Sequence, residues 1–202
     1  SRSARCWTGY ANLAVRPRSR ISESVPNTTG TRSALQAIRR AVGGRASLRI
    51  DANQGWSAGQ TISVMKALEA EGEIFELIEQ PVPAGDIEGM IAIKASIRTP
   101  LLADESAFNL AQVKQLAERA GADLINIKLM KTGGLSQAIA IVDYCQARGL
   151  QCLMGCMLEG GISAAAAVHL AVARSSVITK IDLDGPTLGT FNPIDGNVHF
   201  DD

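Results

Sequence analysis

The chain has 202 residues, 46% of them hydrophobic and 4% aromatic, which is enough apolar mass for one sizeable core. Its 20 basic and 20 acidic residues give a formal net charge of zero, which disfavours nucleic acid and anionic membranes as partners and favours a small molecule. No apolar run reaches the length of a membrane span, and the 4 cysteines show no C-x-x-C spacing. We therefore expect a chain with free thiols in a reducing cytoplasm.

Residues 1–30 differ in composition from the rest of the chain. Several arginines come before the first acidic residue, Glu23, and the first lysine is Lys66. An Arg- and Ser-rich, acid-poor start resembles an organelle transit peptide, but a truncated gene or a stretch read out of frame explains it as well. We treat 1–30 as an atypical segment and 31–202 as one α/β domain.

A regular alternation of helix and strand patterns begins at Thr31. Apolar residues at helical spacing are followed by Gly43-Gly44, Ser57 is placed to cap the next helix, and Gly149 ends a later one. Short apolar runs between the helices are typical of buried parallel strands. We predict helices over 31–42, 57–72, 86–97, 110–120, 135–148 and 162–173, and strands over 47–51, 73–79, 101–104, 123–129, 152–155 and 181–184.

The strand expected near Lys128 has a polar side that ends in this lysine. Asn126 and Lys128 fall on the side opposite the apolar residues, because strand side chains alternate. Lys131 follows in the predicted loop, where Gly133-Gly134 can bring backbone N–H groups close to an anion. Lys128 is therefore the candidate reactive lysine, although a lone lysine that extends from a strand end into water is the plainer alternative.

An acidic residue ends each of the three apolar runs before Lys128, at Asp51, Glu79 and Asp104. The intervals from Asp51 to Glu79, from Glu79 to Asp104 and from Asp104 to Lys128 are 28, 25 and 24 residues. Such a repeat predicts βα units whose parallel strands lie side by side, so that their functional residues share one rim. Three neighbouring carboxylates repel one another unless a cation lies between them, and ligands that are all oxygen favour Mg²⁺. The alternative is that each acid is a separate helix cap or a solvated loop residue.

Six motifs stand at the ends of the expected strands: LRIDANQGW at 48–56, IEQP at 78–81, ADES at 103–106, INIKLMKTGG at 125–134, MGCMLE at 154–159 and IDLDGP at 181–186. Together they resemble the barrel of the enolase superfamily over roughly residues 31–200, and they are most similar to the dipeptide epimerases of the L-Ala-D/L-Glu type. The resemblance implies a (β/α) TIM-like barrel, incomplete at the N-terminus and without the family's capping domain. The exposed edge of an incomplete wall would favour a homo-oligomer.

The resemblance also implies an activity and a role for each candidate residue. The activity is epimerisation of a dipeptide by removal of a proton next to a carboxylate, through an ene-diolate that a metal and a nearby cation stabilise. The implied roles are Mg²⁺ ligands for Asp51, Glu79 and Asp104, acid/base chemistry for Lys128, and substrate binding for Lys131, Asp182 and Asp184, the last two at the α-ammonium.

The chain departs from the family pattern at one functional position. The family supplies a second base from a Lys-x-Lys on the strand before the Asp51 strand, and no Lys-x-Lys occurs here. We therefore expect inversion to be impaired. Two other interpretations stay open: another superfamily enzyme, such as a cycloisomerase or an acid-sugar dehydratase, or a non-catalytic barrel fragment. The pair Asp182 and Asp184 favours the epimerase over the first of these, because an ammonium needs acids there.

Overall fold

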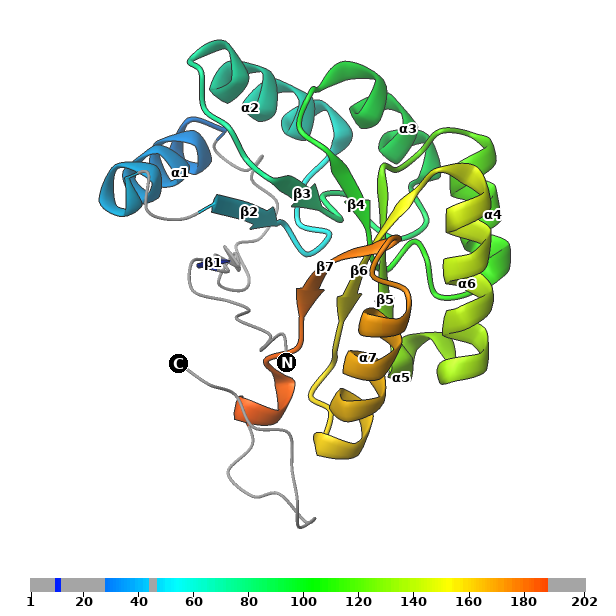
Figure 1. Ribbon diagram of the computed structural model, residues 1–202. Coiled ribbons are helices and arrows are strands. Elements are labelled where there is room, and N and C mark those ends of the chain that lie inside the picture. The colour runs from blue at the N-terminus through cyan, green and yellow to red at the C-terminus, as the bar shows by residue number, and fades with distance from the viewer. Residues whose placement is uncertain (1–9, 12–27, 44–46, 189–202) are drawn as a thin grey trace. The chain divides into compact units, whose positions relative to one another are not determined.

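The computed structural model describes residues 10–11, 28–43 and 47–188, which form successive βα units (Figure 1). The chain divides into two compact units, residues 1–101 with residue 202, and residues 102–201. Most of the atypical segment predicted at 1–30 lies outside the described residues. No helix in the described part of the chain is long and apolar enough to cross a membrane.

The first unit has a parallel sheet in which β2 pairs with β1 on one side and with β3 on the other. Its core includes Leu48 and Ile50 of β2 and Met65 and Leu68 of α2, all nearly or fully buried. Ser57 caps α2 in a capping box, as the sequence predicts. The strands are β1 (Tyr10–Ala11), β2 (Ser47–Asp51) and β3 (Leu77–Glu79), and the helices are α1 (Thr28–Val42), α2 (Ala58–Ala70) and α3 (Ile87–Ser96).

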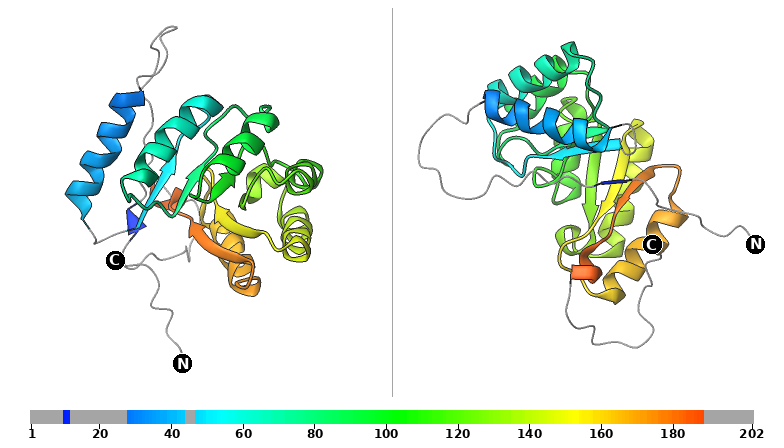
Figure 2. Two further views of the ribbon diagram at one scale, coloured as in Figure 1. Left: turned by 90° about the horizontal axis from the view of Figure 1, so that it is seen from above. Right: turned by 90° about the vertical axis from the view of Figure 1, so that its left-hand side faces the viewer.

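The second unit has four parallel strands that follow one another in chain order from β4 to β7. Helix α6 packs against both α4 and α7 (Figure 2). Its buried face includes Ile141 and Val142. The strands are β4 (Leu101–Ala103), β5 (Leu124–Lys128), β6 (Gln151–Gly155) and β7 (Ile178–Asp182), and the helices are α4 (Leu110–Glu118), α5 (Leu129–Thr132), α6 (Leu135–Arg148), α7 (Gly161–Ala173) and the 3-10 turn η1 (Gly185–Leu188).

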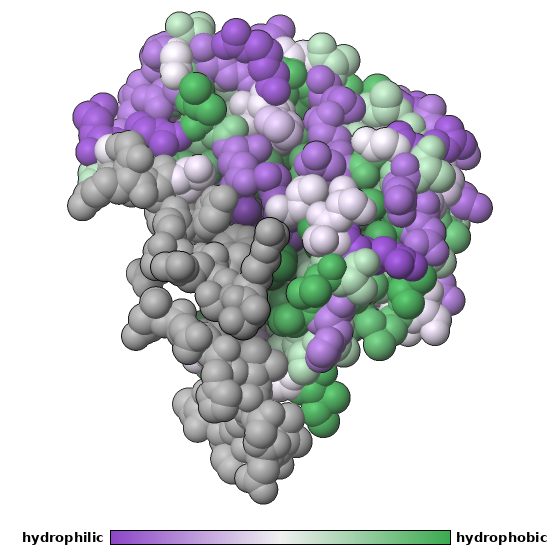
Figure 3. Space-filling model, in the orientation of Figure 1, coloured by the Kyte–Doolittle hydropathy of each residue, from purple (hydrophilic) through white to green (hydrophobic). Residues whose placement is uncertain are grey.

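Exposed hydrophobic side chains gather around α5 and α7, and Figure 3 shows this apolar surface in green where α7 lies. Leu158 is 80% exposed and Ile162 is 70% exposed, so neither contributes to the core of its unit. Met130 and Met157 are exposed as well. These residues follow the carboxyl ends of β5 and β6, which are also the ends that carry the predicted functional residues.

The structure confirms the predicted order of helices and strands but corrects three boundaries. The strand predicted from residue 73 begins at Leu77; the segment before it lies at the surface, where Ile74 is 79% exposed and Glu73 and Glu76 make ion pairs with Arg39 and Arg49. The last strand begins at Ile178 rather than at residue 181. The prediction that Lys131 lies in a loop is wrong, because residues 129–132 form the one-turn helix α5.

Candidate active site

The side chains of Asp104 and Lys128 meet beyond the carboxyl ends of β4 and β5. Asp104 directly follows β4, Lys128 is the last residue of β5, and Lys128 Nζ donates a hydrogen bond to Asp104 Oδ2 at 2.6 Å. The side chain of Lys128 is 17% exposed and that of Asp104 is 7% exposed. The pair is therefore largely screened from water, where an ion pair interacts more strongly than on an open surface.

Lys131 holds the same carboxylate from α5. Its Nζ donates to Asp104 Oδ1 at 2.6 Å, to the backbone oxygen of Asp104 at 2.8 Å and to the backbone oxygen of Asn126 at 2.6 Å. Its side chain is 3% exposed, and Nζ also lies 5.7 Å from the centre of the Phe108 ring. A lysine ammonium has three N–H donors, so protein acceptors engage all three donors of Lys131.

The two lysines determine the charge state of Asp104. Burial alone raises the pKa of this carboxyl group, but the nearby ammonium groups of Lys131 and Lys128 outweigh it and hold the pKa below its ordinary value. Asp104 is therefore an anion at neutral pH. A buried anion with paired cations is stable only while its partners stay in place.

Strand register aligns Lys128 with Asp182 in the second unit. Lys128 pairs with Gly155 of β6, and Gly155 pairs with Asp182 of β7. A Cβ atom at Gly155 would lie 2.5 Å from Asn126 Oδ1, so the absence of a side chain at Gly155 provides the space for Asn126. The three strand ends thus place a lysine, a glycine and a carboxylate at one level.

The segment after Asp182 continues with Asp184, which is exposed. Its backbone oxygen accepts hydrogen bonds from the N–H and the hydroxyl of Thr187, which begin the turn η1. Burial raises the pKa of the nearby Cys156 thiol, and the carboxylates of Asp184 and Asp182 raise it further. The Cys156 thiol therefore stays protonated near neutral pH.

In the first unit, Asp51 and Glu79 are neighbours in register. They are the last residues of β2 and β3, and their Cα atoms are partners across the two strands. Glu79 is 9% exposed, and the residue after it, Gln80, is fully buried with φ +31°, a left-handed conformation that a non-glycine residue rarely adopts. Two adjacent carboxylates suit a hard divalent cation, which would offset their repulsion.

The structure therefore brings the predicted residues together as two sets. Asp104, Lys128 and Lys131 are in direct contact, and Asp51 and Glu79 are adjacent. Within the described residues there is no group of three or more His, Cys, Asp or Glu side chains arranged to hold a metal ion. The chemistry of the oxygen donors at Asp51 and Glu79 nevertheless fits Mg²⁺.

Sequence reasoning assigned no role to Glu159, which is 4% exposed in the loop between β6 and α7. Its Oε1 accepts hydrogen bonds from the backbone N–H groups of Met130 and Met157, each at 3.3 Å, and its Oε2 accepts from the hydroxyl of Ser163. The only hint in the sequence is a carboxylate placed between a strand and Gly160-Gly161 at the start of a helix. That position resembles those of the predicted strand-end acids.

Comparison with known proteins decides the family. The model of the family described as "Enolase C-terminal domain-like" matches residues 9–202. The chain belongs to this enolase family. An L-Ala-D/L-Glu epimerase of Clostridium acetobutylicum is 45% identical over 167 residues, which are 83% of this chain and 46% of the relative.

Solved structures of the enolase family share the fold. The substrate-liganded complex of the L-Ala-D/L-Glu epimerase from Bacillus subtilis superimposes with a TM-score of 0.81 at 36% identity, over 87% of this chain and 48% of that one. The dipeptide epimerase from Enterococcus faecalis, complexed with Mg and the dipeptide L-Leu-L-Tyr, gives 0.80 at 36% identity, over 88% and 49% of the two chains. This agreement confirms the predicted α/β barrel fold, and the chain forms part of such a barrel. The chain spans about half the length of these relatives.

We predict that Lys131→Met destabilises the fold by about 3 kcal/mol, the lower end of the range for breaking a buried ion pair, because Lys128 still contacts Asp104. Met preserves the length of the side chain and removes only its charge and donors. Urea unfolding measures the loss. Lys66→Met, at an exposed position on α2, is the matched control and should change stability by less than about 0.5 kcal/mol. Equal stability of the two variants would contradict the structural role of Lys131.

Proposed function

We propose that this chain carries the proton-transfer part of a Mg²⁺-dependent dipeptide epimerase of the L-Ala-D/L-Glu type. The observation that supports this most directly is the contact of 2.6 Å between Lys128 Nζ and Asp104 Oδ2 at neighbouring strand ends. The names of the relatives give the substrate class, since epimerases of dipeptides are 37–45% identical to this chain.

In this proposal Lys128 transfers the proton at the α-carbon of the residue that is inverted. Removal of that proton from beside a carboxylate produces an ene-diolate, and the proton then returns from a lysine ammonium. Asp182 and Asp184 would hold the substrate's α-ammonium, and the register of β5, β6 and β7 supports this by placing Asp182 level with Lys128. The substrate-binding role of Lys131 stays a prediction, and its contacts point instead to support of Asp104.

Asp51, Glu79 and Asp104 would hold Mg²⁺, as the family resemblance implies. When bound, the ion would supply positive charge against the charge that develops on the substrate carboxylate. Two observations support this assignment: the adjacent register of Asp51 and Glu79, and the solved structure of the Enterococcus faecalis relative in complex with Mg. Asp104 contributes an anion whose low pKa keeps it charged at neutral pH.

The proposal also covers the oligomeric state and the cellular compartment of the protein. That the protein is a homo-oligomer stays a prediction. The described cysteines, Cys145, Cys152 and Cys156, are free thiols, which suits a reducing cytoplasm.

The test of function is exchange of the α-proton of L-Ala-L-Glu in D₂O with Mg²⁺, followed by NMR for both deuterium uptake and inversion. We expect exchange with retention at the face that Lys128 serves, abolished in Lys128→Ala. Inversion should be slower by at least about 10²-fold, because one general acid–base group typically contributes about 10²–10⁴-fold and no Lys-x-Lys supplies the second.

Lys66→Ala is the control for the loss of a lysine and should exchange like the original chain, since Lys66 is exposed on α2. Absence of exchange in the original chain would favour the non-catalytic alternative. Equally fast exchange and inversion would show that a second base acts in this chain and would contradict the predicted impairment.

Metal binding has a separate test that needs no substrate. Saturating Mg²⁺ should raise the melting temperature, because a ligand at about 100 times its dissociation constant stabilises the fold by about 2.7 kcal/mol. Glu79→Gln should remove most of this shift, whereas Glu118→Gln, at an exposed residue that ends α4, should preserve it. An identical shift in both variants would contradict the assignment of Glu79 as a ligand.

A further inference from the structure

We propose that Glu159 is a positioning residue that holds the start of α5, directly after Lys128, against the loop after β6. The inference rests on the proposed function only in assigning the proton transfer to Lys128. Glu159 stands after β6, 29 residues beyond Met130, and it is one of the few buried carboxylates in the described residues. A buried carboxylate is costly unless hydrogen bonds compensate it, so its contacts are informative.

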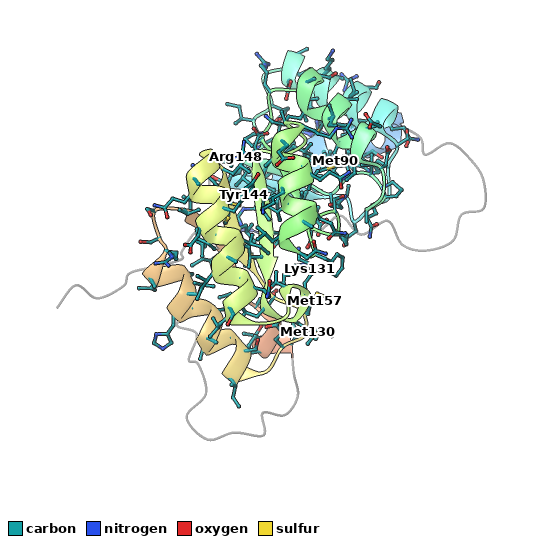
Figure 4. The ribbon with its side chains drawn as sticks, turned by 90° about the vertical axis from the view of Figure 1, so that its right-hand side faces the viewer. Met90, Met130, Lys131, Tyr144, Arg148 and Met157 are labelled. Carbon is teal, nitrogen blue, oxygen red and sulfur yellow. The ribbon has the colours of Figure 1, made fainter. Side chains whose placement is uncertain are left out.

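The carboxylate of Glu159 joins three segments of the second unit. Oε1 accepts from the N–H of Met130 in α5 and from the N–H of Met157 after β6, and Oε2 accepts from the hydroxyl of Ser163 in α7. Figure 4 shows Met130 and Met157 close together, as expected for residues whose N–H groups share one oxygen. Hydrogen bonds to an ionised acceptor are stronger than those between neutral groups.

Met130 matters because of its place in the chain. Lys128 is the N-cap of α5, and its side chain makes no capping hydrogen bond, because an ammonium group has donors only; it donates to Asp104 instead. The first N–H groups of a helix have no partner within the helix, and Glu159 accepts the one from Met130. The hydroxyl of Thr132 donates to the backbone oxygen of Lys128 at 3.1 Å. The turn that begins at Lys128 is thus held by Glu159 from outside and by Thr132 from within.

Loss of Glu159 should therefore increase the mobility of the backbone that carries the Lys128 side chain. Displacement of a reacting group by about 1 Å can cost about 10²-fold in rate. Without Glu159, the N–H groups of Met130 and Met157 would have to find water or another acceptor, and α5 would be free to shift relative to β6. The position of the Lys128 ammonium relative to Asp104 would then vary more.

The test compares two variants at this position with a matched carboxylate elsewhere. Glu159→Ala removes all three hydrogen bonds, whereas Glu159→Gln keeps an acceptor oxygen and nearly the same shape. Glu69→Ala is the control, because Glu69 also accepts from two backbone N–H groups and one hydroxyl, those of Arg98 and Thr99, but in the first unit. The stability of each variant is measured by urea unfolding, so that a loss of overall stability can be distinguished from a local change at Lys128.

The first readout is the reactivity of individual lysines toward an amine reagent at one fixed pH, measured by mass spectrometry relative to exposed Lys66. It reports how accessible Lys128 is and needs no turnover. We expect reactivity of Lys128 to rise several-fold in Glu159→Ala and to return toward the original value in Glu159→Gln. In Glu69→Ala it should stay unchanged at a comparable loss of stability.

The second readout is α-proton exchange of L-Ala-L-Glu in D₂O, which should fall by about 10–10²-fold in Glu159→Ala with little change in KM, because the turn and not the substrate contact is affected. If Glu159→Ala does not fold, Ser163→Ala and Glu159→Gln provide graded losses of the same contacts. Unchanged Lys128 reactivity in every Glu159 variant would overturn the inference. A change in reactivity with no exchange in the original chain would support the positioning role and refute the proposed function instead.

Discussion

The buried carboxylate of Asp104 is the constraint on which the rest of the candidate site depends. It lies directly after β4, is 7% exposed, and carries a negative charge that only nearby cations make tolerable. Lys131 meets this need from α5 and gives its remaining donors to backbone oxygens, including that of Asn126. Lys128 shares the same carboxylate from β5. The positions of β4, β5 and α5 are therefore coupled through one side chain.

This coupling explains why the two lysines have different roles. Lys131 is almost fully buried and is held by three acceptors, so its geometry is fixed by the protein itself. Lys128 is more exposed and lies at the very end of its strand. A group that exchanges protons with a substrate has to be reached by that substrate, and of the two lysines Lys128 meets this condition better. Glu159 then contributes by holding the turn that follows Lys128.

The sequence predicted the parts of the fold that depend on periodicity. Helix α6 was predicted at its observed bounds, and the Ser57 cap and the strand end at Asp51 were predicted as well, because apolar spacing, cap residues and glycines are local signals. The sequence also predicted that Asp104 and Lys128 lie at one edge, because the carboxyl ends of parallel strands meet there, but it did not predict their direct ion pair.

Features set by contacts between distant segments were not predictable in this way. Residues 73–76 precede the observed strand, and their ion pairs, of Glu73 and Glu76 with arginines on α1 and β2, join segments that are far apart in the sequence. The turn of helix at Lys131 is too short for any periodic signal. Glu159 reads as an ordinary loop acid, because its partner Met130 lies 29 residues away.

The most direct test of this account is a double-mutant cycle between Asp104 and Lys131, measured as free energies of unfolding of the original chain, Asp104→Asn, Lys131→Met and the double variant. If the carboxylate and Lys131 act as one unit, each single change should be strongly destabilising. The double variant should then recover part of the loss, with a coupling energy of about 1–3 kcal/mol. Losses that add to within about 0.5 kcal/mol would show that the two groups act independently and would contradict the central role assigned to this pair.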